Sequence, residues 1–216
     1  MLHRYPVALT MDLPKYATLE DGLPRLVAGD GHRYWNPSTV CIYGLAAEQK
    51  WRLNGRYQYA DILVKAADWL VEHARSYYGC EACWIHEEPF VRYGTGPNWI
   101  SGMAQGLAMS MLVRAHQVSG DRVYLDLAVR AQEPLTRRVS DRGVRVDLPD
   151  EDAWFFEEFP HQKGIPIMVL NGNIFAMFGL LDLECAVGVQ GGRSLFRAAL
   201  RYLNSRIEDY SWMGWS

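Results

Sequence analysis

Apolar residues recur at helical spacing in three segments of the chain. The clearest stripe runs over 59–74, and shorter ones run over 124–131 and 195–207. Apolar residues at i, i+3 and i+4 place one hydrophobic face on a helix. A helix that is apolar nearly all round is buried, whereas a helix with a single apolar stripe lies at the periphery. Each stripe is preceded by a segment of the first kind, at roughly 38–54, 101–118 and 167–187.

Short connections with helix-breaking residues join the two members of each pair. Asn54-Gly55 lies between the two segments of the first pair, and Ser119-Gly120 lies between those of the second. Gly188 follows the buried segment of the third pair. Such residues end helices and form turns. The pattern therefore predicts an all-α protein of three helical hairpins, each a buried helix followed by an amphipathic one. Alternation of buried and peripheral helices is typical of an (α/α) toroid or barrel rather than a plain antiparallel bundle, in which all helices are similarly one-sided.

The segments between the hairpins are expected to meet at one end of this barrel, because all hairpin turns lie at the other end. These segments are 1–37, about 76–100, about 134–166 and the tail from 207. They are much longer than ordinary connections, and long loops on a rigid scaffold commonly carry function. Their content is aromatic and basic. They hold Trp35, Trp84, Trp99, Trp154, Trp212 and Trp215, with Arg92, Arg137, Arg138, Arg142, Arg145 and Lys163.

Two parts follow from this division. Residues 1–37 are predicted to form an extended segment that packs on the barrel, and 38–216 the barrel domain with its three hairpins. A length of 216 residues fits one domain or two small ones, and hydrophobic residues make up 49% of the chain. No apolar run approaches the roughly 18 residues that cross a membrane. The start lacks the apolar core of a signal peptide, so we expect a cytoplasmic protein without a membrane partner.

Net charge and cysteine content limit which substrates, metals and macromolecules the chain is expected to bind. A net charge of −3 argues against nucleic-acid binding, which needs a basic stripe. An anionic substrate remains compatible, because local clusters matter more than the total. The chain has four cysteines, and Cys80 and Cys83 form a CxxC pair. No second Cys/His pair follows at zinc-finger spacing, so we expect structural thiols, no metal and no cofactor.

The segment 154–160 reads WFFEEFP and places two carboxylates among aromatic rings, in what the sequence predicts to be a loop. Rings that exclude water raise a carboxyl pKa, because burial disfavours the charged form. A carboxyl group with a pKa nearer neutrality can take and return protons. Flat aromatic faces also pack against sugar rings. The alternative is an aromatic clamp that holds a long loop, with both glutamates pointing to water.

Several short motifs, in order along roughly 34–196, resemble those of the D-glucuronyl C5-epimerases. The family's MAQG…LVRA helix is similar to 101–106 running on to 112–115, and its NP…QYGL segment to 35–37 and 43–45. The remaining similar stretches are GVR at 143–145, EEFP at 157–160, VLNG at 169–172, GLLDL at 179–183 and AADWLV at 66–71.

The resemblance implies an α/α-barrel domain that inverts C5 of glucuronate within a heparosan- or heparin-like polysaccharide, an acidic, uronate-containing partner. The C5 proton lies α to a carboxylate, whose negative charge opposes enolate formation. The enzyme must neutralise that charge, remove a proton from one face of the ring and deliver one to the other. In the family, a glutamate of the EEYP-like motif and tyrosines take these roles. Carried over here, the glutamate is Glu158.

Other residues are candidates on their chemistry. Tyr43 could be the second proton carrier, or a core tyrosine with a satisfied hydroxyl. Asn171 and Gln105 could bond the sugar, or serve as helix caps and interhelix bonds. Asn36 is a further candidate for binding the sugar. Arginine forks match a carboxylate, so Arg145 and Arg114 are expected to bind it, with a structural ion pair as the alternative for Arg114. Trp84, Trp99 and Trp154 could stack on sugars or fill the barrel mouth.

The chain departs from the family at two points. Phe159 stands where the family has a tyrosine, and the family's further tyrosines lie beyond Ser216. We therefore expect a bacterial family member that ends before its last hairpin, and dimerisation or aggregation through exposed inner-helix surface. A polysaccharide lyase is an alternative, because β-elimination begins with the same proton abstraction. A non-catalytic glycan-binding protein is a second alternative, motivated by Phe159 and the missing tyrosines.

Overall fold

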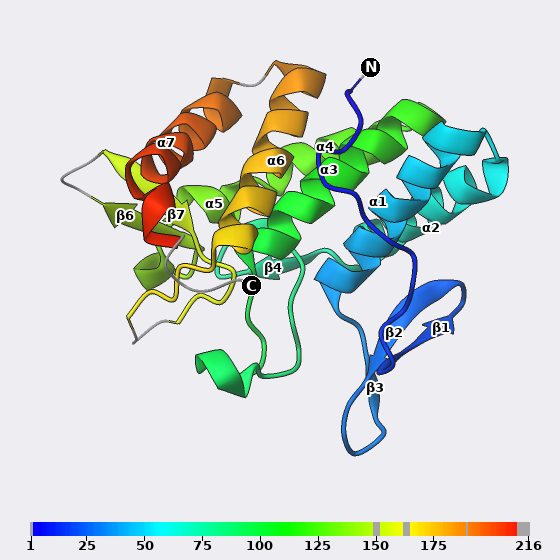
Figure 1. The fold of residues 1–216 in the computed structure, drawn as a ribbon, viewed down its shortest axis with the longest axis horizontal. Coiled ribbons are helices and arrows are strands. Elements are labelled where there is room, and N and C mark those ends of the chain that lie inside the picture. The colour runs from blue at the N-terminus through cyan, green and yellow to red at the C-terminus, as the bar shows by residue number, and fades with distance from the viewer. Residues whose placement is uncertain (1, 149–151, 162–164, 189, 211–216) are drawn as a thin grey trace.

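A computed structural model describes residues 2–148, 152–161, 165–188 and 190–210. Helices dominate it (Figure 1). The α-helices are α1 (Pro37–Asn54), α2 (Tyr57–His73), α3 (Gly102–Ser119), α4 (Arg122–Arg130), α5 (Glu133–Thr136), α6 (Leu170–Val187) and α7 (Gln190–Arg206). Short 3-10 turns are η1 (Val91–Tyr93), η2 (Val139–Asp141) and η4 (Ile207–Tyr210). The strands are β1 (Ala17–Glu20), β2 (Leu23–Val27), β3 (Arg33–Tyr34), β4 (Arg75–Tyr77), β5 (Cys80–Cys83), β6 (Arg145–Leu148) and β7 (Ala153–Phe156).

The six long helices form the three predicted hairpins, α1–α2, α3–α4 and α6–α7. Each first member ends at a glycine with positive φ, namely Gly55 at 69°, Gly120 at 77° and Gly188 at 63°. This left-handed conformation ends a helix at no steric cost only for glycine. The breakers seen in the sequence therefore act as helix caps.

The first helix of each hairpin lies inside and the second outside. Helix α3 is central and packs against α1 on one side and α6 on the other, while α2, α4 and α7 flank them. Because α1 and α6 lie on opposite sides of α3, the described helices form an open arc. Alternation of inner and outer helices is confirmed, and closure of the arc into a toroid stays a prediction.

Strands in the linkers modify the all-α expectation. The described residues form a three-stranded antiparallel sheet, β1–β2–β3, and two hairpins, β4–β5 and β6–β7. The segment 154–160 was predicted to be a loop, but its first half is strand β7, in which Phe156 pairs with Arg145 and Phe155 with Val146. The prediction failed because consecutive aromatic residues hid the period-two alternation by which strands are recognised.

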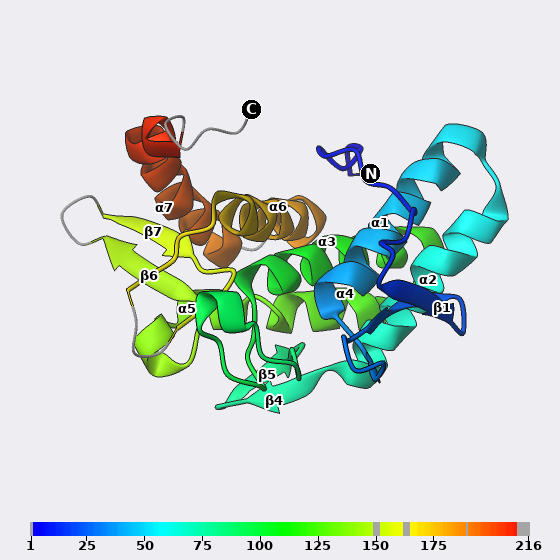
Figure 2. The same ribbon diagram turned by 60° about the horizontal axis from the view of Figure 1, so that its bottom comes forward.

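The N-terminal segment crosses the inner helices (Figure 2). The side chain of Gln49 on α1 accepts a hydrogen bond from the Leu9 amide at 3.0 Å and donates one to the Val7 carbonyl at 2.6 Å. The Tyr5 ring packs against Phe175 and Phe178 of α6, with centroids 6.4 and 5.9 Å away. This segment therefore ties α1 to α6 across α3. The predicted domain boundary at residue 37 stays a prediction.

Helix α6 corrects the expectation that no apolar run in the chain is long enough to cross a membrane. Over Leu170–Val187 it has 18 residues with a mean hydropathy of 1.3, so by length and composition it could cross a membrane. It packs against α3 and α7 and carries Asp182, which pairs with Arg114 of α3. Of the apolar window, 39% is buried in the described structure, so packing against α3 and α7 accounts for part of its apolar character.

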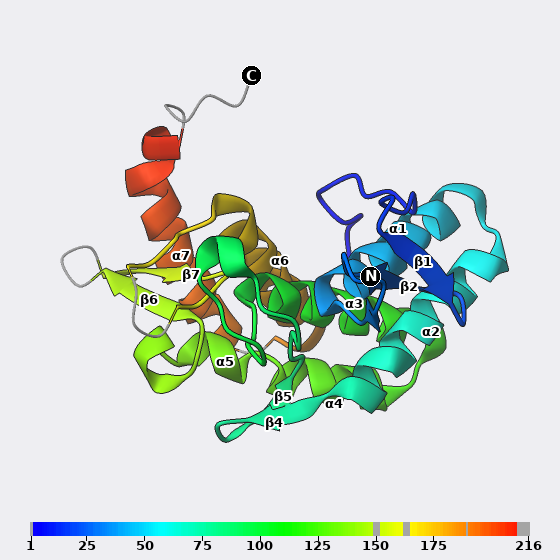
Figure 3. The same cartoon turned by 90° about the horizontal axis from the view of Figure 1, so that it is seen from below.

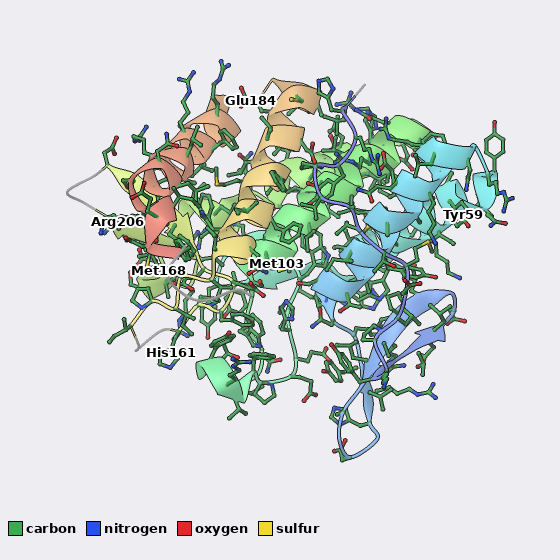
Figure 4. All side chains as sticks on the ribbon, in the orientation of Figure 1. Tyr59, Met103, His161, Met168, Glu184 and Arg206 are labelled. Atoms are coloured by element: carbon green, nitrogen blue, oxygen red, sulfur yellow. The ribbon has the colours of Figure 1, made fainter. Side chains whose placement is uncertain are left out.

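Linkers and hairpin turns separate as predicted. Figure 4 places Met103, at the start of α3, with Met168, just before α6, at the end that also holds His161. Tyr59 and Glu184, close to two of the hairpin turns, lie toward the opposite edge. Viewed from the linker end, the 84–101 loop is central, between the β6–β7 hairpin and the N-terminal sheet (Figure 3). We call this the loop end.

Candidate active site at the loop end

Strand β7 delivers the two glutamates to the starts of α3 and α6. The backbone of Glu157 continues the strand contacts, because its amide donates to the Val144 carbonyl at 2.7 Å. Its own carbonyl accepts a hydrogen bond from the Gly102 amide at 2.8 Å. A Cβ at Gly102 would lie 2.7 Å from that carbonyl oxygen, so only glycine permits this approach. The glutamate pair is thus held by backbone contacts rather than on a free loop.

Glu157 has one carboxyl oxygen bonded and the other without a partner. The residue is 1% exposed, and Oε1 accepts a hydrogen bond from the Met168 amide at 2.9 Å. Oε2 is buried without a hydrogen-bond partner. Burial raises the pKa of Glu157 to about 7, although backbone amides at Met168 and Ile167 favour the charged form. The carboxyl therefore titrates near neutral pH.

Glu158 is fitted against a glycine at the start of α6. A Cβ on Gly172 would lie 2.4 Å from the Glu158 Cβ and 2.8 Å from its Oε2. That Oε2 is also buried without a partner. Burial raises the pKa of Glu158 to about 7, and the negative charge of Glu157 adds to the rise. The LNG motif thus includes the glycine that makes room for the predicted acid/base group.

Phe159 belongs to a cluster of rings over this segment. Its centroid lies 4.9 Å from Phe90, 4.6 Å from Tyr93 and 5.4 Å from Trp99. Trp99 also stacks on the ring of His86 at 4.2 Å. The cluster lies directly after the glutamates along the chain, and burial is the main cause of their raised pKa, as the sequence suggested. The tuned carboxylate is supported, and the alternative with both glutamates in water is wrong.

A cavity of about 500 Å³ opens beside the cluster. Trp99 and Pro160 line it on the side of the glutamates, and Tyr77, Tyr78 and Arg142 line it elsewhere. This volume is in the range of ordinary ligand pockets. Of the tryptophans predicted to stack on sugars, Trp99 therefore lies at a cavity, although its indole N–H already donates to the Glu88 carbonyl at 2.9 Å.

Arg145 and Trp154 lie together on the β6–β7 hairpin. The guanidinium carbon of Arg145 sits 4.4 Å from the centroid of the Trp154 ring. Its Nε is 2.6 Å from Asp147 Oδ1, so its charge is already paired. Both residues line a second cavity of about 560 Å³. They remain candidates for binding, but Arg145 could meet a sugar carboxylate only in competition with Asp147.

Trp84 and Gln105 are in the core. Both are 0% exposed, and the Trp84 indole donates to the Leu70 carbonyl at 2.9 Å. Gln105 accepts from the Trp84 amide at 3.2 Å and donates to the carbonyls of Ala82 and Ala131, each at 3.0 Å. This geometry does not support contact with a sugar. Gln105 satisfies backbone groups that the helix and strand ends would otherwise bury unpaired.

Arg114 has the structural role weighed as its alternative. It is 1% exposed and pairs with Asp182 of α6, while its Nε lies 3.8 Å from Glu48 Oε1 on α1. Its guanidinium also lies 4.9 Å from the Tyr5 ring centroid. Arg114 therefore joins the three inner helices and the N-terminal segment, and it is not placed to receive a substrate.

Tyr43 and Asn36 both belong to α1. Burial raises the pKa of Tyr43, so its hydroxyl stays protonated at neutral pH. Within the described ranges, no hydrogen bond or ring contact joins Tyr43 to Glu158. Asn36 caps α1, because its Oδ1 accepts from the Thr39 amide at 3.0 Å. It also borders a cavity of about 310 Å³ with Trp99 and His86.

The asparagine that contacts strand β7 is Asn173, two residues after the predicted Asn171. Asn171 is exposed in the first turn of α6, which begins after Val169. Asn173 is 0% exposed and accepts a hydrogen bond from the Phe156 amide at 3.0 Å. It fixes the end of β7 just before the glutamates. Sequence reasoning missed it because only the folded contact shows which asparagine faces the strand.

Glu157 and His86 were also missed. Glu157 directly precedes Glu158 just after the end of β7, and successive residues of an extended backbone point to opposite sides. His86 is 6% exposed, and burial lowers its pKa to about 3, so it is neutral. Its Nε2 is buried without a hydrogen-bond partner.

The four cysteines are free thiols, and Cys41, Cys80 and Cys83 are buried. Burial raises the pKa of all three, which disfavours the reactive thiolate. Within the described ranges, no three His, Cys, Asp or Glu residues gather as a metal site. Trp212, Trp215 and Lys163, counted among the loop-end residues, lie outside the described residues.

The described residues form inner and outer helical hairpins, with the buried carboxyl of Glu157 and the partly buried carboxyl of Glu158 at one end, both with a raised pKa. The chain belongs to the D-glucuronyl C5-epimerase family, because the model of the D-glucuronyl C5-epimerase C-terminus matches residues 80–216. It is 34% identical over 167 residues to the D-glucuronyl C5-epimerase of Caenorhabditis elegans, a match that covers 72% of this chain and 26% of that protein.

A solved structure supports the fold independently. A structure of UGL with dGlcA-Glc-Rha-Glc superimposes with a TM-score of 0.52, covering 79% of this chain and 45% of that one, at 16% identity. The chain thus spans about a quarter of the curated relative and under half of the solved one. At this identity the likeness concerns the fold alone, and it supports the helical-hairpin architecture.

Proposed function

We propose that this chain acts as a uronyl C5-epimerase on a heparosan-like polysaccharide, with Glu158 as one acid/base group. The observation that carries the proposal is the carboxyl of Glu158, partly buried at the loop end with a pKa of about 7 in a chain of the epimerase family. A carboxyl with this pKa is partly ionised at neutral pH. It can therefore both accept a proton and return it.

The environment of Glu158 fits abstraction of a weakly acidic proton. Its Oε2 is buried without a hydrogen-bond partner, so the charged form is poorly solvated, and the raised pKa makes the carboxylate a stronger base than a free one. Aromatic rings cluster around Phe159, the next residue along the chain. Glu157 shares this environment. The negative charge of Glu157 raises the proton affinity of Glu158. The Glu158 side chain packs against Gly172 in the first turn of α6.

Inversion also needs a group on the opposite face of the sugar. Tyr43 stays protonated at neutral pH and could donate a proton, but it lies on α1 and no described contact links it to Glu158. Phe159 replaces a tyrosine of the family and cannot transfer a proton. We therefore propose Glu158 as the abstracting group and leave the donor to Tyr43 or to a residue outside this sequence.

The test is incorporation of solvent deuterium at C5 of heparosan, followed by NMR. We expect exchange by the protein and a loss of at least about a hundredfold for Glu158→Gln, since general acid–base catalysis contributes about 10²–10⁴-fold. Glu72→Gln, an exposed carboxylate on α2, is the matched control and should keep full exchange. A Glu158→Gln protein that exchanges at the native rate would exclude Glu158.

Two other outcomes correspond to different functions. Absorbance of an unsaturated uronate would indicate β-elimination, which starts from the same C5 proton and would make the chain a lyase. The UGL structure is named with a glycan that contains dGlcA, which is why this outcome is measured. Binding of heparosan without exchange would indicate a glycan-binding protein. The expected homodimer and cytoplasmic location stay proposals alongside this function.

A further inference from the structure

Arg142 is an arginine at the loop end whose charge is available. Arg145 and Arg138 both pair with Asp147, at 2.6 Å each. Arg137 pairs with Glu133 and donates to the Tyr78 carbonyl at 2.8 Å. Within the described residues, the exposed Arg142 makes no ion pair and no side-chain hydrogen bond. A uronate carboxylate arriving here would therefore meet Arg142 without displacing another anion.

Arg142 lies at the cavity of about 500 Å³ described above. Its guanidinium carbon is 4.7 Å from the centroid of the Tyr78 ring, which is 61% exposed. A guanidinium stacked by its face keeps its edge, with the N–H donors, free for a carboxylate. Tyr77, Trp99 and His161 line the same cavity. The site combines an aromatic surface, a free cation and room for a sugar.

The backbone around this cavity is strained. Tyr78, Asn98 and Arg142 have φ angles of 47°, 59° and 64°, in the left-handed region that side chains avoid. All three line this one cavity. Strain of this kind persists only where neighbours over-determine it, and it gathers at functional sites.

The turn that carries Arg142 is over-determined in this way. The Gly143 amide donates to the Arg138 carbonyl at 2.8 Å, and the Arg142 amide donates to the Val139 carbonyl at 3.1 Å. A Cβ on Gly143 would lie 2.2 Å from the Arg137 carbonyl oxygen. The backbone is thus clamped where it presents Arg142 to the cavity.

We propose that this cavity is a subsite for a uronate unit of the glycan, in which Arg142 binds the carboxylate and Tyr78 packs against the sugar ring. The inference deepens the proposed function and rests on it for the choice of ligand. Pro160, two residues after Glu158, lines the cavity, so the subsite would hold a unit near the reacting one rather than the reacting unit itself. Arg142 takes the role that the sequence assigned to Arg145.

The test measures binding separately from exchange. Calorimetry would compare heparosan oligosaccharides with the same oligosaccharides after reduction of their carboxyl groups to alcohols. We expect Arg142→Gln to weaken binding of heparosan about tenfold or more, because a hydrogen bond to a charged group contributes about 1.5–3 kcal/mol. Binding of the carboxyl-reduced oligosaccharides should change little. Arg56→Gln, an exposed arginine near a hairpin turn, is the matched control.

A second variant separates binding from folding. Arg142→Gly removes the side chain at a left-handed position that glycine adopts without strain, so its urea midpoint should rise while heparosan binding falls. Unchanged affinity in Arg142→Gln, or no binding of heparosan by the native protein, would overturn the subsite. Arg142-dependent binding without deuterium exchange would support the subsite and overturn the epimerase. Deuterium exchange together with binding that does not depend on Arg142 would support the epimerase and overturn the subsite.

Discussion

The crossing of α3 and α6 and the loop end differ in how closely the backbones pack and in whether the acidic side chains have a cationic partner. At the crossing, backbones touch because Gly106 faces α6 and Gly179 faces α3; a Cβ on either would lie 2.3 Å from a carbonyl oxygen. The nearby Gln105 amide bonds three backbone groups. At the loop end, Glu157 and Glu158 each bury a carboxyl oxygen without a partner. The first region is optimised for packing. The second keeps polar atoms available, which costs stability and suits chemistry.

The largest expected effect is a loss of unfolding free energy in the helical region. Arg114→Met removes the cation between Asp182 and Glu48, of which Glu48 is 0% exposed. Removing one partner of a buried ion pair costs about 3–5 kcal/mol, because Asp182 loses its cation, whereas Glu48 keeps its pair with Arg52. Urea unfolding followed by circular dichroism measures this loss. Arg122→Met on the exposed surface of α4 is the control, and equal midpoints for the two variants would contradict the structural role of Arg114.

The next effect tests the contact of the two helix backbones. Gly106→Ala should lower the free energy of unfolding by about 2–3 kcal/mol, because the new methyl forces α3 and α6 apart. Gly29→Ala, where a Cβ meets nothing within 4 Å, should have little effect. Thermal denaturation compares the two. If Gly106→Ala melts like the native protein, the close approach of the helices is wrong.

The third effect concerns the loop end and its dependence on pH. The folded-state pKa of Glu157 is raised to about 7 from an ordinary 4.5, so the folded state binds the proton more tightly. Stability is then greatest below the unfolded pKa and falls as pH rises through about 7, by on the order of 2–3 kcal/mol. Urea midpoints at about pH 5.5 and about pH 8 measure it. Glu157→Gln should reduce this difference, and Glu72→Gln should leave it unchanged.

The smallest expected effect on stability comes from a variant at the loop end that tests the placement of Glu158. Gly172→Ala places a methyl where the Glu158 side chain lies, and that side chain can shift toward solvent. We expect a loss of only about 1 kcal/mol in unfolding free energy but a clear loss of deuterium exchange, because the carboxyl leaves its dry position. Gly29→Ala, where a Cβ meets nothing within 4 Å, should keep exchange. Full exchange in Gly172→Ala would contradict the placement of Glu158.

Periodicity predicted the hairpins well because each long helix has a composition that matches its layer. The stripe over 59–74 is one-sided and forms α2, whereas α3 is apolar all round and lies at the centre. Strands β6 and β7 were not predicted, because they are short and pair with each other across an intervening loop. Short strands are decided by a partner that local patterns do not reveal.

The sequence by itself determined the three hairpins, their glycine caps and the single loop-bearing end, because those features depend on local periodicity and on neighbours along the chain. The choice of Glu158 from the glutamate pair came from the family resemblance. Only the tertiary structure decided which polar residues face the core. It buried Trp84, Gln105 and Arg114, paired Arg145 with Asp147 and left Arg142 free. The reason is physical: a charge is available or neutralised according to what folds against it, and those partners are distant in sequence.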